Sequence, residues 1–101
     1  MLDECVPGRL KRWLTNHDVK TVTDVGWGGI KNGRLLQLLV DGGFEIFVTA
    51  DKNLEYQQHL PALPLAILVL PTNHWTSLQP HQARVMQAFD SLQPGKVTRI
   101  N

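Results

Sequence analysis

The order of apolar and polar residues along the chain predicts alternating helices and strands. Apolar positions recur at helical spacing within residues 6–16 and 77–92, so each segment predicts an amphipathic helix. Another helix is predicted between Asn32, a residue type favoured at N-caps, and the Gly42-Gly43 pair, which favours termination. A short helical stretch is expected after Asp51.

Five segments have the patterns of strands: residues 1–2, 19–25, 44–50, 65–70 and 96–100. The run 65–70 is apolar on both faces, which is typical of an interior parallel strand covered by helices on both sides. We therefore predict a single α/β domain over residues 1–101, with a mostly parallel five-stranded sheet inside a three-layer α/β/α arrangement.

The composition narrows the class of protein. The 101 residues have 43% hydrophobic content, which suits one packed core. Ten basic and nine acidic residues give a net charge of +1, so nucleic-acid binding would have to use local patches. No apolar run reaches the roughly 18 residues of a membrane helix, and Cys5 has no second cysteine to pair with. We expect a cytoplasmic protein without membrane association, in which Cys5 is a buried, inert thiol.

Acidic residues follow three of the predicted strands. Asp3 and Glu4 come after the first strand, Asp24 ends the second and Asp51 follows the third. Carboxyl ends of parallel strands share one edge of a sheet, where ligands collect, so these carboxylates should lie together and repel one another. Mg²⁺ or Mn²⁺ would relieve that repulsion. The alternative interpretation makes Asp51 a helix cap and Asp3 a turn residue.

Other motifs for chemistry are weak. The glycine-rich segment 26–33 matches neither the P-loop nor the dinucleotide-binding pattern, so we interpret it as a turn in which Trp27 contributes to packing. The four histidines lack the spacing of a zinc site, and no serine or cysteine triad can be assembled.

Three stretches of the chain, LDECVP, GWGGIKNGRLL and FVTADKNLEYQQHL, together resemble a family of short PIN-like proteins of about this length. PIN domains are metal-dependent ribonucleases, often the toxins of toxin–antitoxin pairs, with an acidic cluster at the carboxyl edge of a parallel sheet. The resemblance implies that Asp3 and Asp51 are catalytic metal ligands and that Glu4 is a catalytic neighbour. It also implies RNA as the substrate and an antitoxin protein as a partner.

The chain departs from the family pattern at two positions. Asn32 and Asn53 stand where related sequences tend to have acids, although their amide oxygens could still coordinate a cation. Glu4 and Asp24 are further candidate metal ligands. Three cations expected on the same rim could contact the phosphates of single-stranded RNA: Lys31, Arg34 and Lys52.

Three functional hypotheses follow from these residues. The first is a Mg²⁺- or Mn²⁺-dependent ribonuclease that hydrolyses phosphodiester bonds. The second is a catalytically weakened PIN-like module that binds RNA or a protein, and it is favoured by the two asparagines. The third is a receiver-like phosphoacceptor domain, with Thr72 after the fourth strand but with Lys96 before the fifth strand instead of after it. The exposed last strand and short first strand also predict self-association or pairing with a partner.

Overall fold

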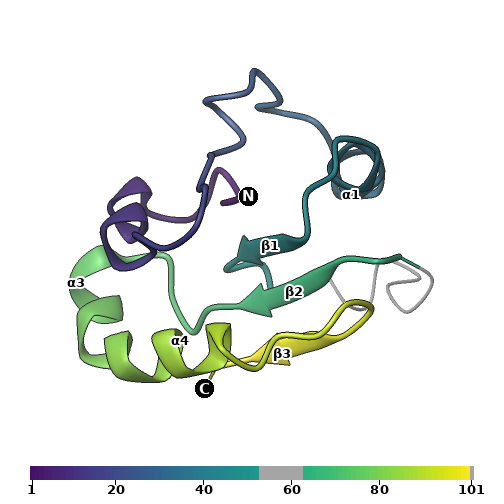
Figure 1. The fold of residues 1–101 in the computed structure, drawn as a ribbon. Helices are drawn as coiled ribbons and strands as arrows, with labels where there is room; N and C mark the ends of the chain where they lie inside the picture. The colour runs from purple at the N-terminus through teal and green to yellow at the C-terminus, as the bar shows by residue number, and fades with distance from the viewer. Residues whose placement is uncertain (53–62, 101) are drawn as a thin grey trace.

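The computed structural model describes residues 1–52 and 63–100. Its elements follow this order: η1 Gly8–Trp13, α1 Asn32–Asp41, β1 Ile46–Thr49, β2 Ala66–Val69, α3 Trp75–Leu78, η3 Gln79–His81, α4 Gln82–Phe89 and β3 Val97–Arg99. Figure 1 shows the strands between α1 on one side and α3 with α4 on the other. The helix expected after Asp51 falls mainly on residues outside the described part.

The sheet of the described residues has three parallel strands in the order β1-β2-β3. The prediction of a five-stranded sheet in a three-layer, PIN-like arrangement is therefore wrong, although a small α/β fold remains compatible with the structure. The first two predicted strands are reduced to single bridge positions, because Leu2 forms isolated parallel bridges with Thr21 and Val48. These bridges continue the sheet beyond β1 by one residue each.

Local turns explain why the first two predicted strands stay short. The amide of Val6 donates to the carbonyl of Asp3 at 3.0 Å, so the chain turns directly after Leu2. Thr21 and Asp24 exchange two bonds: each backbone amide donates to the other side chain, both at 3.0 Å. Such side-chain bonds compete with strand pairing, and they fold residues 21–24 into a turn.

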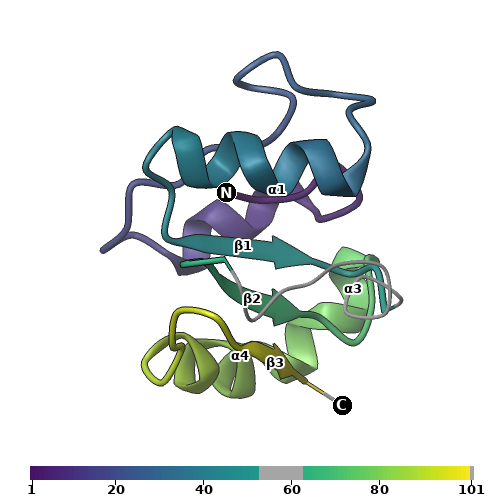
Figure 2. The same cartoon turned by 90° about the vertical axis from the view of Figure 1, so that its right-hand side faces the viewer.

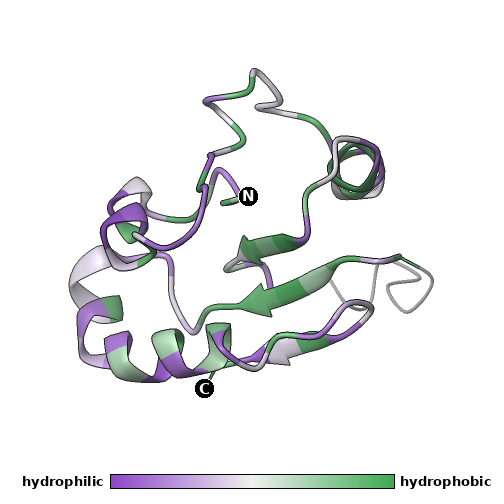
Figure 3. Ribbon diagram, in the orientation of Figure 1, coloured by the Kyte–Doolittle hydropathy of each residue, from purple (hydrophilic) through white to green (hydrophobic). Residues whose placement is uncertain are grey.

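Alternate residues of the strands enter two separate cores, as the period of two in a strand requires. One core combines Phe47, Ile67 and Val69 with the leucines of α1: Leu35, Leu36 and Leu39. The other core combines Val48 and Leu68 with residues from η1, α3 and α4: Leu10, Leu78, Val85 and Phe89. Figure 3 accordingly shows β1 and β2 as strongly hydrophobic. Burying each leucine contributes about 2 kcal/mol. Hydrophobic contacts therefore hold α1 on one face of the sheet and η1, α3 and α4 on the other.

The helices differ from their predicted bounds. Residues 6–16 yield the short 3₁₀ helix η1, and the segment 77–92 is divided by the 3₁₀ turn η3, which contains Pro80. Helix α1 begins at Asn32 with Lys31 in the N-cap position, so Asn32 is not the cap. At its other end Gly42 is the C-cap and Gly43 has a φ of +80°, which confirms the predicted termination.

Two surface features complete the description. A cleft of about 520 Å³ is lined by residues 42–45, which directly precede β1, and by residues 16–20, which follow η1, so it opens at the amino end of β1. Among the described residues, no helix is both long enough and apolar enough to cross a membrane.

Candidate active site at the carboxyl ends of the strands

Thr49 is the residue that organises the carboxyl end of β1. Its side chain is completely buried, and its hydroxyl donates to Oδ2 of Asp3 at 2.7 Å. The same hydroxyl oxygen accepts the backbone N–H of Asp51 at 3.0 Å. Asp3 is also fixed by its own backbone, whose N–H donates to the carbonyl of Val48 at 2.9 Å. One buried hydroxyl therefore links the two aspartates that the sequence places 48 positions apart.

The carboxylate of Asp3 has two further donors. Oδ1 accepts the backbone N–H of Glu4 at 2.9 Å, and Oδ2 lies 3.6 Å from the sulfur of Cys5. That sulfur is also 3.8 Å from the Thr49 hydroxyl. Desolvation by burial raises the pKa of the Cys5 thiol, and the negative charge of Asp3 raises it further. Cys5 as a whole residue is nevertheless exposed, so the expectation of a buried cysteine was wrong.

Glu4 points to the glycine-rich segment. Its Oε1 accepts the backbone N–H of Gly29 at 3.0 Å, and a Cβ on Gly28 would lie 3.5 Å from its Oε2. Gly29 has a φ of +81°, a conformation that L side chains rarely adopt. Glu4 therefore fastens the glycine-rich loop to the turn that carries Asp3, and the described contacts do not direct its carboxylate to Asp3.

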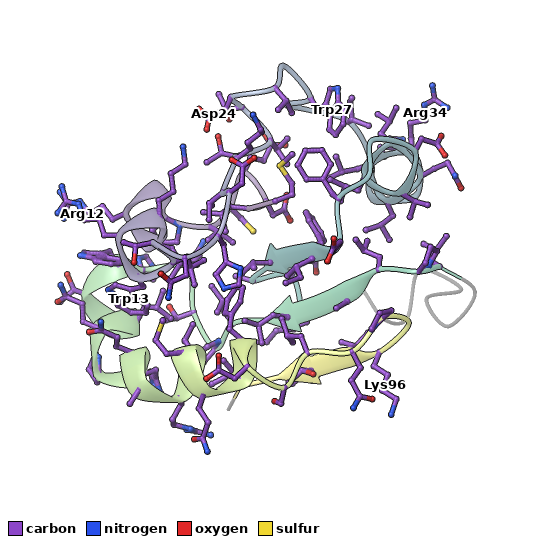
Figure 4. All side chains as sticks on the ribbon, viewed as in Figure 1. Arg12, Trp13, Asp24, Trp27, Arg34 and Lys96 are labelled. Atoms are coloured by element: carbon purple, nitrogen blue, oxygen red, sulfur yellow. The ribbon has the colours of Figure 1, made fainter. Side chains whose placement is uncertain are left out.

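Asp24 is placed in a different environment. Its Oδ2 accepts from Nζ of Lys11 at 2.6 Å and from the amide of Thr21. The hydrogen bond from Lys11, followed by those from Thr21, lowers the pKa of Asp24 from 3.8 to about 2. Both partners of the ion pair are about half exposed, so the pair itself adds little to stability. Asp24 thus fixes a surface turn (Figure 4), and the structure does not bring it to the Asp3–Thr49 contact.

Of the remaining predicted site residues, the structure describes the three cations but neither asparagine side chain. Lys31 and Arg34 are exposed at the start of α1, and Figure 2 shows this end of the helix toward the carboxyl ends of the strands. Lys52 is exposed next to Asp51, and its carbonyl accepts from the Arg99 guanidinium. Asn53 and the side chain of Asn32 lie outside the described part of the structure.

The candidate metal ligands at the site are carboxylates, and the Cys5 sulfur lies beside them, 3.6 Å from Oδ2 of Asp3. Asp3 and Asp51 have carboxylates, a chemistry that suits a hard cation such as Mg²⁺, which needs only one or two carboxylates because it keeps several waters. The buried Thr49 hydroxyl is already engaged, because it donates to Asp3 and accepts the amide of Asp51. However, no group of three or more His, Cys, Asp and Glu side chains within the described ranges converges as a metal cluster. The described side chains therefore do not form a preassembled metal cage.

Sequence reasoning missed Thr49. The signal was present, because a threonine ends an otherwise apolar strand two residues before Asp51. Thr49 is the one polar residue that is buried among the described residues, and a buried hydroxyl requires hydrogen-bond partners. Its partners are the carboxylate of one predicted ligand and the backbone of the other.

Comparisons with models of known protein families, with curated proteins and with solved structures found no match to this chain.

Proposed function

We propose that this protein is a Mg²⁺- or Mn²⁺-dependent ribonuclease related in its chemistry to the PIN-like proteins that its sequence resembles. The observation that carries the proposal is the Thr49 hydroxyl, which contacts the Asp3 carboxylate and the Asp51 amide at the carboxyl end of a parallel strand. Such edges are where α/β sheets bind ligands. The two acids most strongly implied by the resemblance are thus neighbours through one buried group.

Each residue has a defined task in this proposal. Asp3 and Asp51 would hold the cation, which when bound supplies an activated water and stabilises charge on the phosphate. Thr49 orients the Asp3 carboxylate, because its buried hydroxyl accepts the Asp51 amide and donates its proton to Oδ2 of Asp3. Glu4 positions the glycine-rich loop beside the site, and three cations would contact flanking phosphates: Lys31, Arg34 and Lys52.

Cleavage of a fluorescent single-stranded RNA in Mn²⁺ tests the proposal. Wild type should cut the RNA, EDTA should stop cleavage, and Asp3→Asn and Asp51→Asn should each abolish it. Asp24→Asn is the matched control, since it removes the same charge from an aspartate outside the site. Equal cleavage by Asp3→Asn and wild type would overturn the proposal. The toxin hypothesis is tested by inducing expression in bacteria, where growth arrest should require Asp3.

A catalytically weakened binding module is the second candidate. The observation in its favour is that no three metal-ligating side chains converge among the described residues. Calorimetric titration with Mn²⁺ separates the two candidates, because the ribonuclease should give saturable binding that is lost in Asp51→Asn. A flat titration combined with RNA or protein binding would favour the module.

The phosphoacceptor hypothesis receives less support from the geometry. Lys96 directly precedes β3, and Figure 4 shows it on the side of the molecule away from η1. Thr72, the other residue that suggested this hypothesis, accepts the backbone N–H of His74 at 3.2 Å. The lysine that a receiver needs beside its aspartate is thus not supplied by Lys96.

A further inference from the structure

Two tryptophans meet on the surface between η1 and α3. The ring centroids of Trp13 and Trp75 are 4.9 Å apart, and the ring planes are inclined by 39°. Both residues pack against the core that contains Leu10 and Leu78, yet neither is fully buried. The pair therefore forms a partly exposed aromatic surface from residues 62 positions apart in the sequence.

Cationic side chains flank this aromatic surface. A 3₁₀ helix has three residues per turn, so Arg9 and Arg12 lie on one side of η1 and Leu10 and Trp13 lie on the next. Both arginines are exposed, and neither pairs with an acid within residues 1–52 and 63–100. Lys11 differs, because it is neutralised by Asp24.

The aromatic pair lies on the same side of the molecule as the candidate active site. The turn at Asp3–Val6 leads through Pro7 into η1, and α3 follows the carboxyl end of β2 after a short connection. Figures 1 and 2 both show α3 beyond the arrowheads of β1 and β2. The six residues of η1 span about 12 Å. A strand bound at Asp3 could therefore extend along η1 to the tryptophans.

We propose that Trp13 and Trp75 form a stacking platform for the unpaired bases of single-stranded RNA, with Arg9 and Arg12 contacting the adjacent phosphates. Aromatic rings bind bases of any sequence because every base has a π face, and arginines beside them bind the backbone. Bases of a duplex are already stacked and paired, so the platform selects single strands. The choice of RNA rests on the proposed ribonuclease function, and the platform places the substrate strand along η1.

Fluorescence anisotropy with a labelled, unstructured 12-nucleotide RNA in EDTA tests the platform without cleavage. Trp75→Leu, which keeps an apolar side chain but removes the ring, should weaken binding by about tenfold. Trp75→Phe should retain most of the affinity, because it retains a π face. The same RNA annealed to its complement should bind at least several-fold more weakly. Equal affinity of wild type and Trp75→Leu would overturn the inference, and so would a preference for the duplex.

The arginines are tested through the salt dependence of binding. Arg12→Ala should weaken binding and reduce the slope of log K against log salt by about one. Lys96→Ala is the matched control, because it removes one exposed positive charge on the opposite side of the molecule (Figure 4). The inference fails if both variants change the slope equally. Circular dichroism of each variant verifies folding, and if Trp75→Leu does not fold, Trp75→Phe and Arg12→Ala decide.

Intrinsic fluorescence locates the contact. Trp27 packs against Phe44 with ring centroids 6.1 Å apart, in the core that α1 covers, and is therefore separate from the platform. Quenching by RNA should persist in Trp27→Phe and should decrease in Trp13→Phe and Trp75→Phe. If quenching were lost in Trp27→Phe and unchanged in Trp13→Phe and Trp75→Phe, the inference would be overturned.

The outcomes for the platform and for the ribonuclease are separable. Binding in EDTA that depends on Trp75, without any Mn²⁺-dependent cleavage, would support the platform and contradict the proposed ribonuclease. Cleavage that requires Asp3 but proceeds with unchanged affinity in Trp75→Leu would support the ribonuclease and contradict the platform.

Discussion

Asp3 and Asp24 each follow a segment that the sequence predicts as a strand, yet the fold gives them different environments. Asp3 accepts a hydrogen bond from the buried hydroxyl of Thr49 in a strand 46 positions away. Asp24 accepts from Thr21, three residues earlier, and from the exposed Lys11. A carboxylate held by local partners stabilises a turn, whereas one held by a distant strand is positioned relative to other elements. Only the second arrangement is suited to building a site.

The largest expected difference between the two aspartates is in catalysis. Asp3→Asn should reduce Mn²⁺-dependent RNA cleavage by more than the roughly 10–100-fold typical of residues that only orient a ligand. Asp24→Asn should leave cleavage within about twofold of wild type, because its contacts are with Lys11 and Thr21. Initial rates at saturating Mn²⁺ measure both effects. A larger loss in Asp24→Asn would reverse our assignment of the two residues.

Removing the hydroxyl that positions Asp3 should have the next largest effect. Thr49→Val keeps the shape of the side chain and removes the donor to Oδ2 of Asp3 and the acceptor for the Asp51 amide. We expect cleavage or Mn²⁺ affinity to fall by about 10–100-fold. Thr49→Ser should restore much of it, because serine keeps the hydroxyl. Valine and serine variants of equal activity would show that the hydroxyl has no part in the site.

Acid should affect the Asp24 turn in a defined pH range. The folded-state pKa of about 2 lies below the ordinary value of 3.8, so the contribution of Asp24 to stability is present above pH 4 and is lost as the pH falls through about 2. Urea unfolding of wild type and Asp24→Asn between pH 5 and pH 2 measures this. The two proteins should differ modestly at pH 5 and converge at pH 2. A difference in stability that grows toward low pH would contradict the predicted loss of the Asp24 contribution in acid.

The reactivity of Cys5 reports the charge of Asp3. Burial and the Asp3 carboxylate raise the pKa of the thiol, so alkylation by iodoacetamide at pH 8 should be slower than that of a free small-molecule thiol. Asp3→Asn removes the neighbouring charge and should accelerate alkylation by about two- to threefold. Asp24→Asn provides the control with an unchanged rate. No response to Asp3→Asn would mean that the thiol is unaffected by the carboxylate.

The smallest effect concerns self-association. β3 pairs with β2 on one side only, so its other edge has no partner strand in the described sheet. Open strand edges favour pairing between chains. Light scattering at increasing concentration should therefore show a weak dimer fraction, and Val97→Pro should reduce it because proline removes a backbone donor from the open edge, whereas Thr98 faces β2. A strict monomer at high concentration would contradict this prediction.

The sequence anticipated the elements whose patterns are long or strongly apolar. Strands β1 and β2 lie within the predicted segments 44–50 and 65–70, and α1 lies between Asn32 and the Gly42-Gly43 pair. Burial patterns of this kind are decided by residue type, so they can be read without coordinates. The segments 1–2 and 19–25 pair only through isolated bridges at Leu2, because one turn begins directly after it at Asp3–Val6 and another lies at Thr21–Asp24.

The candidate site could be predicted only in outline. Asp3 and Asp51 were expected at one sheet edge, and the structure joins them through Thr49, which the pattern analysis had treated as part of a strand. Glu4 and Asp24 were expected as ligands, but their carboxylates contact the Gly29 amide and the Lys11 ammonium group. Which polar partner a carboxylate finds depends on distances between segments, and periodicity carries no information about these distances.

The sequence alone determined which segments are apolar enough to form the interior, because hydrophobic burial depends on residue type and its period. The tertiary structure decided which side chains meet: Thr49 with Asp3, and Trp13 with Trp75. Both pairs join residues far apart in the chain, and each contact depends on how η1, α3 and β1 are packed together. Hydrogen bonds and ring contacts act over a few ångströms, so their partners are fixed only once the chain has folded.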